Sequence, residues 1–255
     1  MSFLNKGVRN IDTEYTPIDC LPGDCITSKV TKLRKDIDLG HGLEQIDDEV
    51  VCTHAGVLRY RAPAHYFIED NYRTILCPKV GDQVVGIVED RGSEFYKINI
   101  FTGSPATLNR LAFEGATKRN RPDLKRGDVV YCRILNIDKD VDIELTCISS
   151  SGVKKDWASG EAIYGSLVAG LIIKVPPSYS NKMLHPQNIV LNSLGKNLPF
   201  EVAIGMNGAI WFKANSPAET IIIRNCILNA QSMDDPTTIE AMVEVLIARF
   251  HKDNK

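Results

Sequence analysis

The chain has 255 residues, with 30 basic and 32 acidic side chains that give a formal net charge of −2, and 44% of its residues are hydrophobic. This near-neutral charge argues against a protein that coats nucleic acid through bulk positive charge, although it leaves room for a local basic patch. No apolar run approaches the ~18 residues of a membrane helix, and the first residues lack a signal-peptide core, so we expect the protein inside the cell.

Seven cysteines are present, an odd number with no Cys-x-x-Cys pair, and the five histidines show no metal-ligand spacing. Reduced thiols in a reducing compartment are the simplest interpretation. We therefore expect no disulfide framework, no metal and no cofactor.

The first part of the chain predicts a flexible N-terminus over residues 1–16 and a small all-β domain over residues 17–78. A Pro22-Gly23-Asp24 turn opens the β domain. Short strand-like runs punctuated by Gly, Asp and Asn follow it, in the stretches VVCTHAGVLRYRA and HYFIEDNYRTILC.

For residues 79–149 we expect a small Greek-key barrel of the OB kind, because four or five short strands alternate with Gly-Asp turns. The clearest strand is EFYKINIF, which places Tyr96, Ile98 and Ile100 on one face. We expect these three side chains in the core. The opposite face presents Phe95, Lys97 and Asn99, as either a stacking group beside a cation for RNA or an ordinary half-exposed strand face.

Residues 150–255 change to an α+β pattern of strand, one or two helices, hairpin and further helices, close to the order of a KH domain. One helix is expected with Pro186 in its first turn and Gly195 as its C-cap. A capping box of Ser216 and Glu219 marks the start of another. The expected fold class is thus multidomain β plus α+β.

The sequence GMNG, from Gly205 to Gly208, has the spelling of the KH clamp loop that grips a nucleic-acid backbone. A clamp joins two helices and carries cations, whereas this stretch lies between apolar, strand-like runs and carries Met206 and Asn207. Asn-Gly between such runs is typical of a β-hairpin turn. We expect a structural turn, with Trp211 just beyond it packed at a seam between domains; stacking of Trp211 on a base is the alternative.

Several stretches together resemble the cap subunits of the RNA exosome, in particular the exosome component 3 family. These stretches, in chain order, are LPGD, LGHGL, PKVGDQVVGIV, FEGATKRNRPDLKRGDVV and GMNGAIWFKA. The resemblance covers nearly the whole chain after about residue 17, and it departs from the family's pattern at VPPSYSNKMLHP, residues 175–186.

The resemblance implies a non-catalytic subunit with an N-terminal, an S1 and a KH domain, in that order. It implies RNase PH-like ring subunits and other S1-bearing cap subunits as partners, and single-stranded RNA guided into the pore of the ring. It also implies processing and decay of rRNA, mRNA and other RNAs, and a place in nucleus, nucleolus and cytoplasm. A free-standing S1/KH protein that binds single-stranded RNA is the alternative.

The stretch KRNRPDLKR, Lys118 to Arg126, holds five cations and one acid, so its local charge is 5 − 1 = +4. Phosphate contacts require such density, and loops between OB strands flank the binding face. A solvated loop, or one that docks on an acidic partner, is the alternative. The candidate RNA-binding residues are Phe95, Lys97, Lys118, Arg119, Arg121, Lys125 and Arg126.

Catalytic patterns are missing from the sequence: it has no P-loop, no Gly-x-Ser-x-Gly and no paired-acid metal motif. Asp138, Asp140, Asp142 and Glu144 alternate along one strand-like stretch, and a metal-dependent hydrolase would use such a set. We expect a solvated hairpin edge there instead, and no enzyme.

Overall fold

The computed structural model describes residues 18–30, 37–40, 42–61, 65–69, 76, 78–138, 141–149, 157, 162–233 and 235–253. The chain forms two compact units, Met1–Tyr72 and Arg73–Lys255. The stretch 1–16, which the sequence predicts to be flexible, lies outside the described residues.

The first unit is built from short strands. A four-stranded sheet has the order β1 (Ile18–Cys20), β5 (Gly56–Arg61), β6 (His65–Glu69) and β2 (Asp38–Leu39), and β3 (Leu43–Ile46) pairs with β4 (Glu49–Cys52) as a hairpin. A four-residue helix, α1 (Thr27–Val30), joins β1 to β2. The core of this unit comprises Cys20, Ile26, Val50, Cys52, Leu58, Tyr66 and Ile68. The expected N-terminal β module is confirmed.

The second unit begins with a closed barrel. Its strands are β7 (Gln83–Arg91), β8 (Phe95–Asn99), β9 (Ala106–Phe113), β10 (Val129–Asn136) and β11 (Ile143–Cys147). The sheet order is β11-β9-β8-β7-β10, and β11 also pairs with β10, which closes the barrel. A short strand beyond the barrel sequence, β12 (Gly165–Leu167), adds to the outer edge of β10.

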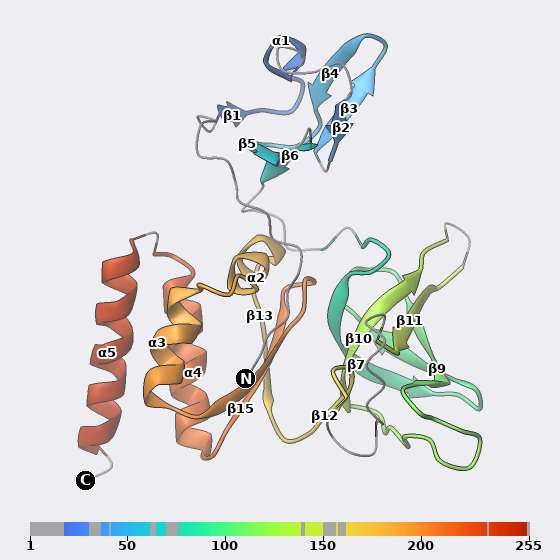
Figure 1. The fold of residues 1–255 in the computed structure, drawn as a ribbon, viewed down its shortest axis with the longest axis vertical. Coiled ribbons are helices and arrows are strands. Elements are labelled where there is room, and N and C mark those ends of the chain that lie inside the picture. Colours follow the sequence, from blue (N-terminus) through green and yellow to red (C-terminus); the bar gives the residue numbers. More distant parts are fainter. Residues whose placement is uncertain are drawn as a thin grey trace. The chain divides into compact units, whose positions relative to one another are not determined.

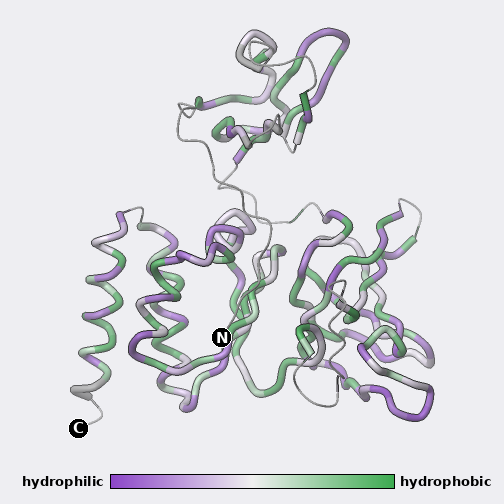
Figure 2. The backbone as a smooth tube through the Cα atoms, in the orientation of Figure 1, coloured by the Kyte–Doolittle hydropathy of each residue, from purple (hydrophilic) through white to green (hydrophobic). Residues whose placement is uncertain are grey.

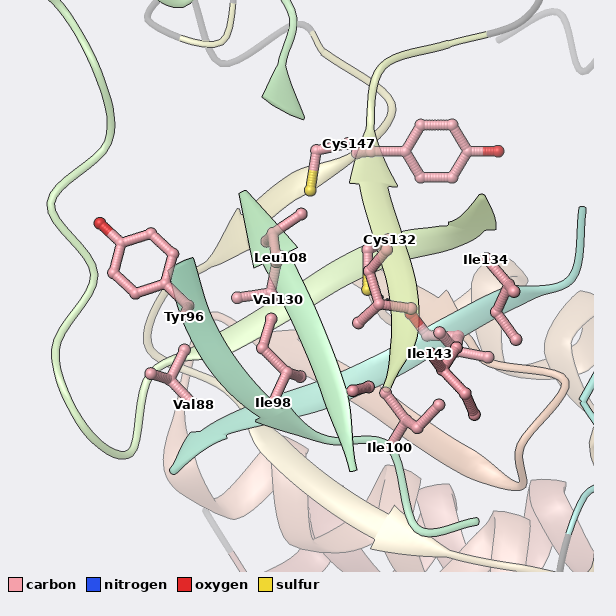
Figure 3. Close-up of a cluster of buried hydrophobic side chains, with 14 of the residues drawn as sticks. Val88, Tyr96, Ile98, Ile100, Leu108, Val130, Cys132, Ile134, Ile143 and Cys147 are labelled. Atoms are coloured by element: carbon pink, nitrogen blue, oxygen red, sulfur yellow. Dashed lines mark hydrogen bonds between the residues drawn. The ribbon is translucent and has the colours of Figure 1, made fainter. Parts of the chain in front are cut away.

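The barrel core follows from alternation along its strands. Tyr96, Ile98 and Ile100 are buried, as expected for one face of β8, while Phe95 and Lys97 are exposed. In Figure 3, aliphatic side chains from several strands fill the interior, and the Tyr96 ring lies at one end with its hydroxyl pointing away from them. A polar group is thereby available at the rim of an otherwise apolar core.

A three-stranded antiparallel sheet and four helices complete the unit. The sheet order is β13 (Leu171–Lys174), β15 (Ala209–Ala214) and β14 (Phe200–Ile204). The helices are α2 (Pro177–Met183), α3 (Ile189–Asn197), α4 (Pro217–Ala230) and α5 (Pro236–Asp253). This strand–helix–helix–hairpin–helix order confirms the KH-like C-terminal region, and with it the expected fold class.

The sequence predicted the start of α4 correctly but not the ends of α3. Ser216 accepts a hydrogen bond from the Glu219 backbone N–H, which confirms the expected N-cap of α4. The prediction for α3 was wrong at both ends. Asn188 is its N-cap, so Pro186 precedes the helix, and Gly195 lies inside a helix that continues to Asn197.

The two faces of the KH-like sheet have different neighbours. Helices α3, α4 and α5 lie on one side of it and the barrel lies on the other, as Figure 1 shows. The barrel side is apolar: Val85 of β7 packs with Ala209 and Trp211 of β15. The barrel and the KH-like region therefore share a buried surface within one unit.

Helix α5 is amphipathic, and in Figure 2 hydrophilic and hydrophobic stretches alternate along it. Its buried residues include Ile239, Val243 and Ile247, which pack in the KH-like core. No helix in the described part of the chain has the length and apolar character required to cross a membrane.

Candidate nucleic-acid interface

The outer face of β8 presents two of the three residues expected there. The Phe95 side chain is 45% exposed, and Lys97, two positions along the same strand face, is exposed as well. Asn99 is engaged locally, because its Nδ2 donates to Glu89 Oε1 at 2.7 Å and its Oδ1 accepts from the Phe101 N–H at 2.8 Å. An aromatic ring and a cation are thus exposed on this face.

The basic stretch forms the connection between β9 and β10, and we call residues 118–126 the basic loop. All five of its cations are exposed. None of them makes an ion pair with any residue that the structure describes. Pro122 and Leu124, by contrast, are buried. The loop therefore packs its apolar residues inward and presents its cations to solvent.

Tyr96 fastens the basic loop to the barrel. Its hydroxyl donates to the Pro122 carbonyl oxygen at 2.8 Å and accepts from the Leu124 N–H at 3.3 Å. At the end of the loop, the Lys125 N–H donates to the Asp128 carboxylate at 2.7 Å. The loop backbone is consequently held on both sides of Asp123.

The single acid of the loop is held by two arginines from the barrel. Asp123 receives two bonds from the Arg91 guanidinium, Nη2 to Oδ1 at 2.7 Å and Nη1 to Oδ2 at 3.2 Å. Arg110 Nη2 lies 3.2 Å from Asp123 Oδ1. Both oxygens are thus paired within the protein, so the carboxylate is engaged by the barrel while the five cations of the loop are not.

Sequence reasoning missed Arg91 and Arg110, although a signal for Arg110 was present. In β9, Ala106 and Leu108 are buried, and strand alternation places Arg110 on the same face. It is buried too, with 6% of its surface exposed. An arginine at an inward position requires a partner, because an unpaired buried charge is costly.

The GMNG stretch is the turn between β14 and β15, and it reaches into the barrel. The Asn207 side chain donates from Nδ2 to the carbonyl oxygens of Val85 and Ile100, each at 2.8 Å, and accepts at Oδ1 from the Val85 N–H at 3.3 Å. The Met206 N–H donates to the Gln83 carbonyl oxygen at 2.8 Å. These bonds join the KH-like hairpin to the start of β7 and to Ile100, which directly follows β8.

Glycines flank this turn because backbone from other elements lies against it. A Cβ on Gly205 would lie 2.7 Å from the Val85 backbone nitrogen, and one on Gly208 would clash with the Val175 carbonyl oxygen. Gly208 also has a φ of +75°, which side chains rarely adopt. Trp211 is 3% exposed on the barrel side of the sheet, in contact with Val85 and Ala209.

Tyrosines add polar contacts to the same seam. The Tyr131 hydroxyl donates to Gln83 Oε1 at 2.8 Å, and Gln83 Nε2 donates to the Tyr164 hydroxyl at 3.0 Å. Burial raises the pKa of Tyr131 well above its usual value, so its hydroxyl stays protonated and remains a donor.

The expected residues fall into two groups. Phe95, Lys97 and the basic loop lie around the end of β7 and along β8, linked by Tyr96 and Arg91. Asn207 lies at Val85, near the other end of β7; Val85 and Arg91 are six residues apart, or about 20 Å along a strand. The turn therefore belongs to the seam and not to the basic surface.

The acidic stretch from Asp138 to Glu144 shows no catalytic arrangement among those of its residues that the structure describes. Asp140 lies outside the described residues, Asp138 and Glu144 are exposed, and Asp142 is half-buried. Within the described ranges, no three His, Cys, Asp or Glu side chains gather closely enough to hold a metal ion.

Comparisons with known proteins agree with this domain order. Residues 76–158 match the family described as exosome complex component RRP40, S1 domain, and residues 170–218 match a KH domain family. Exosome complex component RRP40 of Drosophila melanogaster is 38% identical over 209 residues, which cover 81% of this chain and 86% of that one. The human RRP40 is 34% identical over 200 residues, which cover 76% of this chain and 70% of that one.

A solved structure shares the fold at lower identity. It is described as a putative exosome complex RNA-binding protein, with a TM-score of 0.55 and 19% identity, and it covers 69% of this chain and 99% of its own. At this identity the likeness concerns the arrangement of elements alone.

Proposed function

Because the chain belongs to the family of exosome complex component RRP40, we propose that it serves as a cap subunit that stabilises the exosome ring and guides RNA into its pore. The observation that carries the proposal is the order of the two matched families in this chain, the RRP40 S1 domain and then a KH domain, in a chain that matches a relative over 86% of that relative's length. The RRP40 family is non-catalytic, which confirms the expectation that this chain is not an enzyme.

The proposed partners are RNase PH-like ring subunits, the other S1-bearing cap subunits and single-stranded RNA. The proposed role is 3′-to-5′ processing and decay of rRNA, mRNA and other RNAs by a separate nuclease. The proposed locations are nucleus, nucleolus and cytoplasm. These proposed partners, roles and locations derive from the resemblance of the sequence to exosome cap subunits. The names of the relatives support membership of the exosome.

The proposed RNA surface consists of Phe95 and Lys97 on β8 together with the cations of the basic loop. Three features support it: an exposed ring beside a cation, unpaired cations on an anchored loop, and an acid held by barrel arginines. Stacking and phosphate contacts are the two elements of sequence-tolerant single-strand binding. Gly205, Asn207, Gly208 and Trp211 are proposed as structural residues of the seam.

The proposed domain boundaries are 17–78, 79–149 and 150–255. Strand β12, Gly165–Leu167, pairs with barrel strand β10. The third segment therefore begins by completing the sheet of the second.

Affinity purification of the tagged full-length protein, followed by mass spectrometry and native sizing, tests the cap role. We expect RNase PH-like proteins and two other S1-bearing subunits in one large particle. Recovery of the protein alone would overturn the proposal. Sub-micromolar binding of single-stranded RNA by that lone protein would then support the free-standing alternative.

A pair of double variants tests the RNA surface. We expect Lys118→Ala/Arg119→Ala to weaken binding of a labelled oligouridylate. The slope of log K against the logarithm of the salt concentration should become less steep by about 1.4, since each lost phosphate contact on a single strand removes about 0.7 from it. Lys196→Ala/Arg224→Ala removes two exposed cations from KH-region helices and serves as the matched control. Loss of ring subunits without loss of RNA affinity would assign the loop to a protein partner instead.

A further inference from the structure

Arg110 occupies an unusual position for an arginine at the rim of the barrel. It is buried, and its guanidinium contacts three separate segments of the S1 domain. Nη1 donates to the Ser93 carbonyl oxygen in the β7–β8 turn at 3.3 Å, and Nε donates to the Tyr96 hydroxyl on β8 at 3.1 Å. Nη2 donates to Asp123 Oδ1 in the basic loop at 3.2 Å. One side chain thus joins a hairpin turn, a strand and the loop.

The Tyr96 hydroxyl completes this cluster. It donates one hydrogen bond, to the Pro122 carbonyl oxygen, and accepts two, from Arg110 Nε and the Leu124 N–H. A phenolic hydroxyl has one proton to donate, so its donor capacity is used. The Arg110 guanidinium carbon also lies 5.0 Å from the centre of the Tyr96 ring, a cation–π distance.

Asp123 is the only loop side chain that this cluster holds through charge. Its removal would leave the Arg110 guanidinium, whose side chain is 7% exposed, without a carboxylate, and although Asp123 itself is 61% exposed, a buried charge without a charged partner is unfavourable. The pairing therefore fixes where the loop lies relative to β8, which carries Phe95 and Lys97. Arg110, Tyr96 and Asp123, which form this cluster, are not themselves part of the proposed RNA surface.

We propose that Arg110, Tyr96 and Asp123 are positioning residues, which hold the cations of the basic loop at a fixed place relative to Phe95 and Lys97 so that one single-stranded RNA contacts both. The inference rests on the proposed function for its RNA ligand. The inference predicts that the acidic residue Asp123 promotes binding of the polyanionic RNA, although its negative charge alone would weaken that binding.

The sign of this effect gives the test. Asp123→Asn removes a negative charge, so loop cations that acted only through net charge would bind RNA more tightly in the variant. Positioning predicts the reverse: an affinity for a labelled oligouridylate that falls about fivefold at low salt, in the range of one ordinary hydrogen bond lost. Tyr96→Phe removes one hydroxyl without changing charge, and we expect a loss in the same direction.

Glu94→Gln is the matched control. Glu94 lies in the β7–β8 turn, is exposed, and makes no side-chain ion pair with any residue in the described ranges. Its substitution changes the charge by the same amount on the same hairpin and leaves the cluster intact. We expect unchanged or slightly tighter RNA binding.

Limited trypsin digestion of the native full-length protein measures the position of the loop without RNA. The loop offers cleavage sites at its lysines and arginines, and release from the barrel speeds cleavage of such segments. We expect faster cleavage within residues 118–126 in Asp123→Asn and Tyr96→Phe, and the wild-type rate in Glu94→Gln. Circular dichroism and thermal melting show whether each variant is folded.

Each outcome has a distinct meaning. Weaker RNA binding with faster loop cleavage in both cluster variants supports the inference. Tighter binding by Asp123→Asn, or an unchanged cleavage rate in both variants, overturns it. A wild-type protein that binds no RNA overturns the proposed RNA surface and the RNA part of this inference, while the cleavage rates still decide whether the cluster holds the loop.

Discussion

Replacement of Asn207 by alanine is the sharpest test of how the barrel and the KH-like sheet are joined. Asn207 is 2% exposed and makes three hydrogen bonds, two to Val85 and one to Ile100. Strand β8 pairs with β7 only as far as Ile87, opposite Asn99, so Val85 lies beyond the last β7–β8 pair. The Asn207 amide supplies the donor and acceptor that a neighbouring strand would have given Val85.

The expected cost follows from those three bonds. A hydrogen bond contributes about 1 kcal/mol net, and a buried backbone group left without a partner costs about 1–3 kcal/mol. We therefore expect Asn207→Ala to lower the free energy of unfolding of the second unit by about 3 kcal/mol. With a urea m-value of about 2 kcal/mol/M, the transition midpoint would fall by about 1.5 M.

Urea unfolding followed by tryptophan fluorescence measures this change, because Trp211 lies at the same seam. Met206→Ala is the control: Met206 contributes its backbone N–H to Gln83, which alanine retains, so we expect a loss below about 0.5 kcal/mol. A loss below about 1 kcal/mol for Asn207→Ala would refute the view that its amide completes the pairing of β7.

Asn207→Asp adds a pH dependence with a defined sign. An ionised carboxylate cannot donate to the carbonyl oxygens of Val85 and Ile100, whereas a protonated carboxyl retains one donor. Its folded-state pKa is therefore raised, and the variant loses stability as the pH rises through that value. A destabilisation that was the same at pH 5 and pH 8 would contradict this reasoning.

Two further predictions concern backbone space and a buried thiol. Gly208→Ala should destabilise the second unit by more than about 2 kcal/mol in thermal melts, because of its positive φ and its contact with Val175. Gly195→Ala, inside α3 with open space around it, should instead stabilise by about 0.5–1 kcal/mol. Burial raises the pKa of Cys132 from 9.0 to about 12, so the unfolded chain ionises there first and stability falls as the pH rises above 9. In Cys132→Ala the free energy of unfolding should fall less steeply with pH above 9, by about 1.4 kcal/mol per pH unit. Equal slopes in the wild-type protein and the variant would disprove this.

The sequence predicted features that depend on local patterns. The alternation of EFYKINIF correctly separated buried Tyr96 from exposed Lys97, since strand period alone decides which face is inward. The start of α4 was predicted because Ser216 caps it through a bond to a residue three positions on. Both features depend on residues close together in the chain.

Features that depend on distant partners were not predicted. Gly195 was expected to end a helix, but Leu194 is buried in the KH-like core and α3 continues through the glycine to Asn197. The Arg110 cluster joins residues up to 30 positions apart, from Ser93 to Asp123. Alternation places Arg110 inward, but it does not identify the carboxylate that it meets.

The bond between Asn207 and Val85 also has a consequence for recombination between proteins. A chimera that joined this barrel to another KH module would carry an incomplete strand edge at Val85, unless the donor supplied an amide at the equivalent turn. The KH module packed against a barrel that lacks matching backbone groups would in turn bury the Asn207 amide without partners. The smallest segment of this chain that can be exchanged intact therefore spans both modules, from about β7 to α5.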